Sequence, residues 1–418
     1  MHVVVIGAGI VGAVSAVELL RDGHQVTILE PGEPGGEQAA SYGNGGWLSP
    51  SSVLPVSSPG LWRKVPGYLA DPLGPLTIRW SYFVKALPWL TRLLTSGWTW
   101  NRVRETSLGL APLVAGSPEL HLKLATEAGV PELIHRTGQL YIFPTRADYE
   151  DSRESWDIRR ARGIKTIEVD EDELRQREPH LDRRYTFALY CEDGGHCSDP
   201  GAYVAALVRL AEERGAQRVR GTAERLDIQA GRLKGVVSAG KTIACDAAVL
   251  AAGAHSRELA HLAGDRVILE TERGYHAVIE HPEVSPRTPV MPSDGKMVHT
   301  PMAGGLRIAG QVEIAGLEAA PNWKRAEILR DHALRTWPGL PRDLPADRVK
   351  VWMGHRPSTP DGLPCIGKAT GCPDVVHAYG HGHIGLASGA MTGRLVADIV
   401  SGKHPTIPIA PFNPARFN

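Results

Sequence analysis

Residues 2–30 read HVVVIGAGIVGAVSAVELLRDGHQVTILE, and this stretch decides the fold. The β-branched run at 2–6 is typical of a buried parallel strand. Residues 13–21 predict a helix that ends near Gly23, and residues 25–30 predict a second strand. Together these elements form one compact βαβ unit, the building block of doubly wound α/β folds.

The turn of this unit has the sequence GAGIVG (7–12), and its second strand closes on Glu30. Gly7 allows the tight turn, Gly9 lets the backbone approach a pyrophosphate, and Gly12 permits close packing of helix and strand. The amino end of the helix offers unpaired N–H groups to phosphate, and Glu30 can hydrogen-bond ribose hydroxyls. The unit therefore predicts a bound dinucleotide, either FAD or NAD.

Two further glycine-rich turns favour FAD. Residues 40–50 (ASYGNGGWLSP) can wrap backbone amides around phosphate and a flavin ring. Residues 378–393 (AYGHGHIGLASGAMTG) predict a strand, a glycine turn and a helix whose amino end could stabilise negative charge on a reduced flavin. In this turn His383 is expected on the substrate side of the ring, whereas His381 is equally compatible with a turn histidine satisfied by backbone.

Residues 352–367 (WMGHRPSTPDGLPCIG) supply a candidate for substrate binding. Arg356 comes just before a rigid proline-rich turn. A guanidinium holds a carboxylate through two parallel hydrogen bonds and thereby fixes the neighbouring α-carbon. Arg356 is thus a candidate carboxylate clamp, with a surface arginine as the alternative, and Asp361 with Gly362 is interpreted as turn chemistry.

Composition narrows the class of protein. The chain has 418 residues with 46 Lys+Arg and 46 Asp+Glu, and this balance argues against a nucleic-acid binder, which needs a basic excess. Its five cysteines are irregularly spaced and form no CxxC pair, so neither a disulfide framework nor a metal site is predicted. The apolar start lacks the basic leading region and cleavage site of a signal peptide, and a cytoplasmic location is expected.

The segment 47–105 holds six of the ten tryptophans. Within it, residues 76–94 (LTIRWSYFVKALPWLTRLL) mix apolar side chains with Arg79, Lys85 and Arg92. One interpretation is a helical lid whose apolar face packs on the body of the protein. The other is a surface that contacts an electron-accepting partner or, peripherally, the inner face of a membrane.

Nearly the whole chain resembles the FAD-dependent D-amino-acid dehydrogenase group of the glycine/D-amino-acid oxidase (DAO) superfamily. The elements that carry this resemblance are GAGIVG with Glu30, Ser41-x-x-Asn44-x-Gly46 followed by Ser49-Pro50, VLAAGAHS (249–256), Arg273-Gly-Tyr275, Gly-x-Arg-Pro-x-x-Pro-Asp (354–361) and Gly-His-Gly (380–382).

The resemblance implies an FAD-dependent enzyme that oxidises an amino or imino acid by hydride transfer from Cα to flavin N5. It implies substrate-contacting roles for Arg356 and Tyr275, with Tyr275 hydrogen-bonding the same carboxylate as Arg356. His383 is added to the catalytic candidates because of its place in the glycine turn at 378–393. The residues expected to bind the cofactor are Gly7, Gly9, Ile10, Val11, Gly12, Glu30, Ser41, Asn44, Gly45, Gly46, Ala223, Gly253, Gly380, His381, Gly382, Ile384 and Gly385.

The chain departs from the common pattern of the family at His355 and His383. The tail is similar to the cis-4-hydroxy-D-proline dehydrogenase branch, which makes a cyclic or hydroxylated imino acid an alternative to a general D-amino acid. An oxidase of N-substituted glycine, a flavin-binding subunit of a hetero-oligomeric amine dehydrogenase and an NAD-dependent dehydrogenase are further alternatives. Oxygen, a quinone and a carrier protein all remain open as electron acceptor.

The expected fold class is α/β, with a Rossmann-like FAD-binding domain interwoven with an α+β substrate domain that contains an antiparallel sheet. The FAD-binding domain is assigned residues 1–46, 151–265 and 350–418. The substrate domain is assigned residues 47–150 and 266–349.

Overall fold

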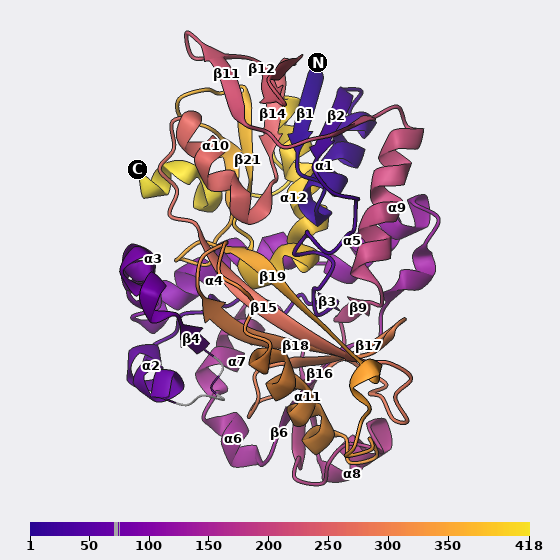
Figure 1. Cartoon of the computed structure of the whole chain (residues 1–418). Coiled ribbons are helices and arrows are strands. Elements are labelled where there is room, and N and C mark those ends of the chain that lie inside the picture. Colours follow the sequence, from indigo (N-terminus) through magenta and orange to yellow (C-terminus); the bar gives the residue numbers. More distant parts are fainter. Residues whose placement is uncertain (71–73, 75) are drawn as a thin grey trace.

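The computed structural model describes residues 1–70, 74 and 76–418. Two large sheets organise the chain, one in the upper and one in the lower half of the view in Figure 1. The upper sheet has six strands in the order β10 (Gln217–Arg220), β2 (Gln25–Glu30), β1 (His2–Ile6), β14 (Ala247–Leu250), β21 (Val375–Tyr379) and β20 (Cys365–Lys368). Its strands pair in parallel except β20, which runs antiparallel at one edge.

Alternation along β1 shows how the upper sheet is covered on both faces. Val3 and Val5 pack against a layer of three helices, α1 (Ile10–Arg21), α9 (Pro200–Glu213) and α12 (Gly385–Val400). Val4 and Ile6 point to the other face, which is covered by α10 (Ser256–Leu262) and by the small sheet of β11 (Arg225–Gln229), β12 (Arg232–Ser238) and β13 (Lys241–Ala244). Burial on both faces explains the continuous β-branched run that marks this strand in the sequence.

The lower sheet has nine strands and is mostly antiparallel. Its order is β19 (Val349–Ser358), β15 (Glu270–Ile279), β18 (Gly305–Ile314), β17 (Val298–Met302), β16 (Val290–Pro292), β6 (Gln139–Phe143), β8 (Phe187–Cys191) and β7 (Ile167–Val169), with β4 (Leu76–Ile78) paired to β18. Helix α11 (Lys324–Thr336) packs on β15 and β18, where Tyr275, Ala277, Ile308 and Trp337 belong to one buried cluster. The expected combination of a Rossmann-like domain and an antiparallel substrate sheet is therefore confirmed.

Three segments pack in a different half of the fold from the domain that the sequence assigned to them. Strands β7 and β8, assigned to the FAD-binding domain through 151–265, belong to the lower sheet, as does β19 from the segment 350–418. Helices α4 (Trp100–Val114) and α5 (Ser117–Glu127), assigned to the substrate domain, pack on α12 instead. Sequence order misled these assignments because pairing partners lie far apart in the chain, as in the register of Phe187 with Phe143.

Segment 47–105 covers one side of the junction between the sheets. It contains α2 (Leu61–Ala70), a 3₁₀ turn at Trp80–Tyr82 and α3 (Phe83–Ser96). Ala86 and Trp89 of α3 pack on β4 and β18, as expected of a helical lid. Trp80 and Val84 face outward and are 74% and 78% exposed. No helix in the described part of the chain is long and apolar enough to cross a bilayer.

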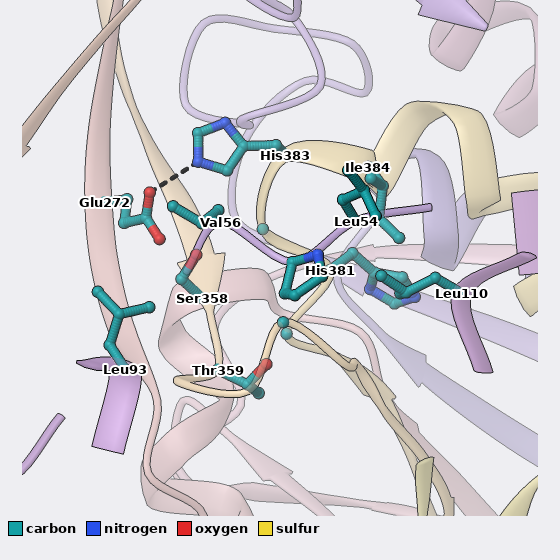
Figure 2. A pocket seen from close by; sticks show the side chains of 14 residues that line it. Leu54, Val56, Leu93, Leu110, Glu272, Ser358, Thr359, His381, His383 and Ile384 are labelled. Atoms are coloured by element: carbon teal, nitrogen blue, oxygen red, sulfur yellow. Dashed lines mark hydrogen bonds and ion pairs between the residues drawn. The ribbon is translucent and has the colours of Figure 1, made fainter. Parts of the chain in front are cut away.

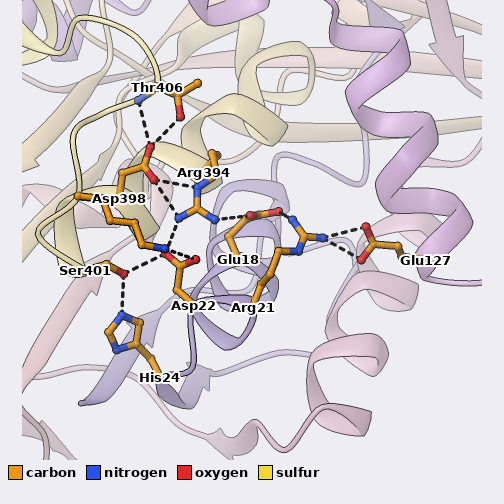
Figure 3. A network of polar contacts seen from close by, with 10 residues as sticks. Glu18, Arg21, Asp22, His24, Glu127, Arg394, Asp398, Ser401 and Thr406 are labelled. Carbon is orange, nitrogen blue, oxygen red and sulfur yellow. Dashed lines mark hydrogen bonds and ion pairs between the residues drawn. The ribbon is translucent and has the colours of Figure 1, made fainter.

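A network of ion pairs joins the ends of α1 and α12 (Figure 3). Arg394 of α12 contacts Glu18 at 2.8 Å and Asp398 at 3.0 Å, and it also pairs with Asp22. All three carboxylate side chains are less than 10% exposed. Because the pairs are largely shielded from water, removing the shared cation would leave several carboxylates without their partner.

We expect Arg394→Met to lower the free energy of unfolding by about 3–5 kcal/mol, the range for breaking a buried ion pair from one side. The loss should be largest near neutral pH. Burial alone would raise the pKa of Asp22, but hydrogen bonds from Arg394 and Lys403 outweigh burial and hold this pKa well below its ordinary value. A carboxyl with a lowered pKa in the folded state stabilises the fold above about pH 4 and loses that contribution as the pH falls. Urea unfolding at several pH values measures both effects, and equal stability of variant and wild type at neutral pH would contradict them.

Candidate active site

A cavity of about 720 Å³ lies between the two sheets. One end is lined by the turn between β1 and α1 and by Glu30 at the end of β2. The other end is lined by residues of β15, β18 and β19, by α3 and by the turn before α12. Parallel strands thus deliver their carboxyl ends to the cavity, the position where ligands bind in doubly wound sheets.

Glu30 organises the nucleotide end of the cavity. Its Oε2 accepts a hydrogen bond from the Ala8 N–H at 2.7 Å, and its Oε1 accepts one from the Gly32 N–H at 3.1 Å. Ser41 reaches over the turn, where its hydroxyl accepts from the Ile10 N–H at 3.0 Å. The acid at the end of β2 therefore fixes the glycine turn while its remaining lone pairs stay available for ribose hydroxyls.

The glycines of the turn have different tasks. A Cβ on Gly12 would lie 1.9 Å from the Gly7 carbonyl oxygen, so only glycine lets α1 pack on the turn. Gly7 has φ of +101°, and a Cβ there would lie 2.6 Å from the Ala251 carbonyl oxygen. A Cβ on Gly9 would meet only the Ser41 hydroxyl, at 3.4 Å. Packing therefore does not require glycine at position 9. The absence of a side chain there leaves room for a ligand at the cavity wall.

The loop 40–46 is held against the cavity by the lower sheet. Arg307 of β18 donates to the carbonyls of Tyr42 at 3.2 Å and Asn44 at 2.8 Å. The Asn44 side chain accepts from the Gly46 N–H at 2.8 Å. Sequence reasoning predicted the loop but missed Arg307, because an isolated arginine in a strand carries no signal of a partner more than 200 residues away.

Arg356 lies at the substrate end. Its guanidinium donates to the Gln311 carbonyl at 3.0 Å and to the Gly310 carbonyl at 3.4 Å. These acceptors belong to a bulge of β18, where Gln311 has φ of 61°. No acidic side chain lies within ion-pair distance of Arg356 in the described residues. Burial lowers the pKa of Arg356 and nearby Glu272 raises it, with burial the larger effect.

The glycine of the Arg-Gly-Tyr element, Gly274, leaves room for the Arg356 side chain. A Cβ at Gly274 would lie 2.1 Å from the Arg356 Cζ, so the guanidinium packs flat on the bare backbone of β15. The sequence shows a glycine at position 274. Only the pairing of β15 with β19 shows that Arg356 packs against it.

His383 and Glu272 form a pair that lines this cavity and also the small adjoining pocket that Figure 2 shows. His383 Nε2 lies 2.7 Å from Glu272 Oε2. The His383 side chain is 38% exposed, whereas that of Glu272 is 3% exposed. Burial would raise the pKa of Glu272, but His383, Ser358 and Arg356 together hold this pKa below its ordinary value, so the carboxylate is ionised.

Two further histidines beside this pair are neutral. His381 is bonded to the Thr392 hydroxyl at 3.0 Å, and burial lowers its pKa to about 3. His355 is bonded to the Thr271 hydroxyl at 3.0 Å, and burial, together with Arg273 and His255, lowers its pKa to about 4. Both rings therefore shape the wall of the cavity without adding charge.

Tyr275 does not line the cavity, so its expected contact with the substrate carboxylate is corrected. Its hydroxyl donates to Glu313 at 2.5 Å and accepts from the Asn322 N–H at 2.9 Å, on the side of the sheet that α11 covers. Burial and then Glu313 raise the pKa of Tyr275 to about 12. The reason is the two-residue period of a strand, which turns Glu272 and Gly274 toward the cavity and Tyr275 away from it.

We expect Tyr275→Phe to leave KM for the substrate unchanged and to lower the free energy of unfolding by about 1–3 kcal/mol, because Glu313 loses a buried donor. Steady-state kinetics and urea unfolding of the same preparation measure the two effects. A rise in KM without loss of stability would show that Tyr275 contacts the substrate after all.

Of the other residues expected from sequence, most meet at the cavity. Those that line it are Gly7, Gly9, Ile10, Val11, Glu30, Ser41, Asn44, Gly45, Ala223, Gly253, His381, Gly382, Ile384, Gly385, Arg356 and His383. Gly12 and Gly46 support the lining turns from behind, and Gly380 lines a small adjoining pocket near His381. Glu272 and Arg307 are the functional candidates that the sequence did not predict, and the contact of Gly274 with Arg356 was also not predicted.

The residues present fit FAD. Gly9, the N-cap residue of α1, has no side chain that could cap the helix, and the first turn of α1 has no acidic residue, which suits a pyrophosphate. The amino end of α12 lines the opposite end of the cavity and also lacks an acidic residue in its first turn, which suits the electron-rich edge of a reduced flavin. Glu30 lies where ribose hydroxyls are expected.

Fold and cavity together define a dinucleotide-dependent oxidoreductase. The chain belongs to the FAD dependent oxidoreductase family, which matches residues 2–399. The predictions of this superfamily, of an enzyme and of FAD as its cofactor are thereby confirmed.

Individual relatives cover the whole chain. A D-amino-acid oxidase of Bradyrhizobium diazoefficiens is 59% identical over 416 residues, which are 100% of this chain and 99% of the relative. A D-amino acid dehydrogenase of Methylobacterium radiotolerans is 31% identical and covers 97% of both chains. Among solved structures, glycine oxidase from Geobacillus kaustophilus has a TM-score of 0.73 at 24% identity, covering 99% of this chain and 98% of its own, and so shares the fold.

Proposed function

We propose that this enzyme oxidises a D-amino acid or a cyclic imino acid at the Cα–N bond and that Arg356 holds the substrate carboxylate. The observation that carries this proposal is a guanidinium that lines the cavity, is bonded to two carbonyl oxygens and forms no direct ion pair among the described residues, because the nearby Glu272 is bonded to His383 instead. Such a group binds a carboxylate through two parallel hydrogen bonds. The names of the relatives at 59% and 31% identity support the same substrate class.

The apolar wall of the cavity indicates which side chains it accepts. Leu90 and Leu93 of α3, Val312 and Ile314 of β18, and Leu76 of β4 line the cavity beyond Arg356. The ionised Glu272 nearby disfavours an acidic side chain. We therefore expect apolar or cyclic substrates to be preferred over D-aspartate and D-glutamate.

The protein contributes position and electrostatics to this reaction. Bound FAD supplies the two-electron acceptor for the hydride that leaves Cα. Arg356 fixes the carboxylate, and therefore the orientation of Cα, while the apolar side chains of α3 and β18 that line the cavity disfavour water around the reacting carbon.

Anaerobic mixing of the purified protein with candidate substrates tests the proposal. The panel holds D-proline, hydroxy-D-prolines, apolar and acidic D-amino acids, N-substituted glycines and the matching L-enantiomers. We expect the apolar or cyclic D-compounds to bleach the flavin absorbance. If no D-amino or D-imino acid does so, the proposed substrate class is wrong, and reduction by N-substituted glycines alone would favour the secondary-amine alternative.

We further propose that 76–94 makes peripheral contact with a membrane that carries the electron acceptor. The outward-facing Trp80, Val84 and Leu87 support this, since they are 74%, 78% and 43% exposed beside the exposed cations Lys85 and Arg92. Sedimentation with anionic phospholipid vesicles should pull down wild type and leave the double variant Trp80→Ser, Val84→Ser in solution. Equal sedimentation of both proteins would contradict the contact, and full turnover with oxygen alone would make it unnecessary.

A further inference from the structure

The pair of Glu272 and His383 has the geometry of an oriented base. Glu272 is buried and ionised, and its Oε2 lies 2.7 Å from His383 Nε2. The carboxylate therefore keeps the proton of the imidazole on Nε2, which leaves Nδ1 as the nitrogen with a free lone pair. Figure 2 shows Nδ1 on the side of the ring that faces away from Glu272, and His383 lines the cavity.

The other charged and titratable groups around His383 do not compete for this task. His381, in the same turn, is neutral and bonded to Thr392, and His355 of β19 is neutral and bonded to Thr271. Arg356 of β19 always carries its proton. Among the groups that share this end of the cavity, His383 is thus the one placed to accept a proton.

Pairing of the strands places the base beside the carboxylate clamp. Glu272 of β15 is directly opposite Arg356 of β19, and both line the cavity. Side chains in such a pair start from Cβ atoms about 4.5–5.5 Å apart. His383 is bonded to Glu272 and lines the same cavity as Arg356, so a substrate whose carboxylate lies on Arg356 has its amino group, which is bonded to the same Cα, at the end of the cavity that His383 lines.

We propose that His383 Nδ1, oriented by Glu272, takes the proton from the substrate ammonium before hydride transfer. This inference rests on the proposed function. The N–H bond of the ammonium breaks, the proton forms an N–H bond on Nδ1, and the nitrogen keeps the electron pair. That pair then forms the C=N bond as the Cα hydrogen leaves with its two electrons to the FAD, so the substrate is oxidised and the flavin is reduced by two electrons. His383 is the catalytic residue in this step, and Glu272 is a positioning residue.

The pH dependence of flavin reduction tests the step. The rate of reduction by the best D-substrate is measured anaerobically from about pH 6 to about pH 10, a range that includes the deprotonation of a free amine. We expect His383→Ala to lower the second-order rate constant near neutral pH by about 100-fold or more. Above the pH at which the free substrate amine loses its proton, the variant should approach wild type, because a base is no longer needed.

Glu272 is tested by a matched pair of variants. Glu272→Gln should lower the neutral-pH rate in the same direction, and Glu272→Asp should restore part of it. Tyr275→Phe, whose side chain lies outside the cavity, serves as the control and should keep the wild-type profile. A loss that is equal at every pH, or profiles that coincide with wild type, would overturn the role of the pair in proton transfer.

A measurement without turnover gives independent evidence. In the holoenzyme labelled with ¹⁵N-histidine, with His383→Ala used for assignment, long-range ¹H–¹⁵N spectra should show His383 protonated on Nε2 and unprotonated on Nδ1 in the neutral ring. Glu272→Gln should weaken that preference. The opposite tautomer in wild type would contradict the inference. If no amino acid reduces the wild-type flavin, the proposed substrate class is wrong. The spectra then still show whether Glu272 orients the His383 ring as inferred.

Discussion

Arg356→Ala is expected to lower kcat/KM by about 30- to 5,000-fold, because removing one partner of a desolvated charge pair costs about 2–5 kcal/mol. Most of this loss should appear as a higher KM. The guanidinium has two carbonyl anchors on the bulge of β18 and no direct ion pair in the part of the chain that the structure describes, since its neighbour Glu272 is bonded to His383, so the substrate carboxylate is its expected counter-ion. Steady-state kinetics on D-enantiomers measure the change.

The control for this experiment is Arg356→Lys, which keeps the charge and loses the planar fork. It should fall between wild type and Arg356→Ala. Both variants should retain FAD, because the cavity lining around Glu30 and the turn of α1 is remote in sequence and belongs to the other sheet. An unchanged KM in a flavin-loaded Arg356→Ala protein would remove Arg356 from the substrate site.

The FAD-binding half of the fold was predictable because its signals are local. The first βαβ unit lies within 30 contiguous residues, and β1, β2 and the end of α1 occur at the predicted positions. The steric need for glycine at position 12 is also predictable, because its close contact is with Gly7 in the same turn, whereas the contact of Gly7 with Ala251 is long-range. The substrate sheet is different, because β6 pairs with β8 and β16, and β15 pairs with β19, across long stretches of chain. No periodicity identifies such partners.

The same contrast between local signals and long-range contacts explains which residues of the site could be predicted. Arg356 and His383 stand out in the sequence because each lies in a distinctive turn. Glu272 was missed because it is one acid in a strand that also contains Glu270, and its partner His383 is 111 residues away. Tyr275 was misplaced because the resemblance identifies a motif and not the face of the strand on which it lies. Side chains alternate between the two faces of a strand, so Glu272 shares the cavity face with Gly274, whereas Tyr275 lies on the opposite face.

The second large effect is expected at the glycines of the first turn. Gly12→Ala should lower both the stability of the protein and its FAD content strongly, because its Cβ would lie 1.9 Å from the Gly7 carbonyl oxygen, a backbone atom that cannot move without opening the turn. Overpacking of this kind typically costs about 1–3 kcal/mol and more where backbone must shift. The measurements are the urea midpoint of unfolding and the FAD content after gel filtration.

Gly9→Ala is the matched variant and separates packing from binding. Its Cβ has ordinary room, with only the Ser41 hydroxyl at 3.4 Å, and Gly9 has φ of −66°, which any residue adopts. The FAD-free protein should therefore keep its stability within about 0.5 kcal/mol. FAD affinity should still fall by about 10- to 100-fold, since the methyl group enters the space for the pyrophosphate and weakens about one charged hydrogen bond, worth about 1.5–3 kcal/mol. Equal FAD affinity in Gly9→Ala and wild type would show that the pyrophosphate does not approach this turn, and equal stability of Gly12→Ala and wild type would show that the turn can open.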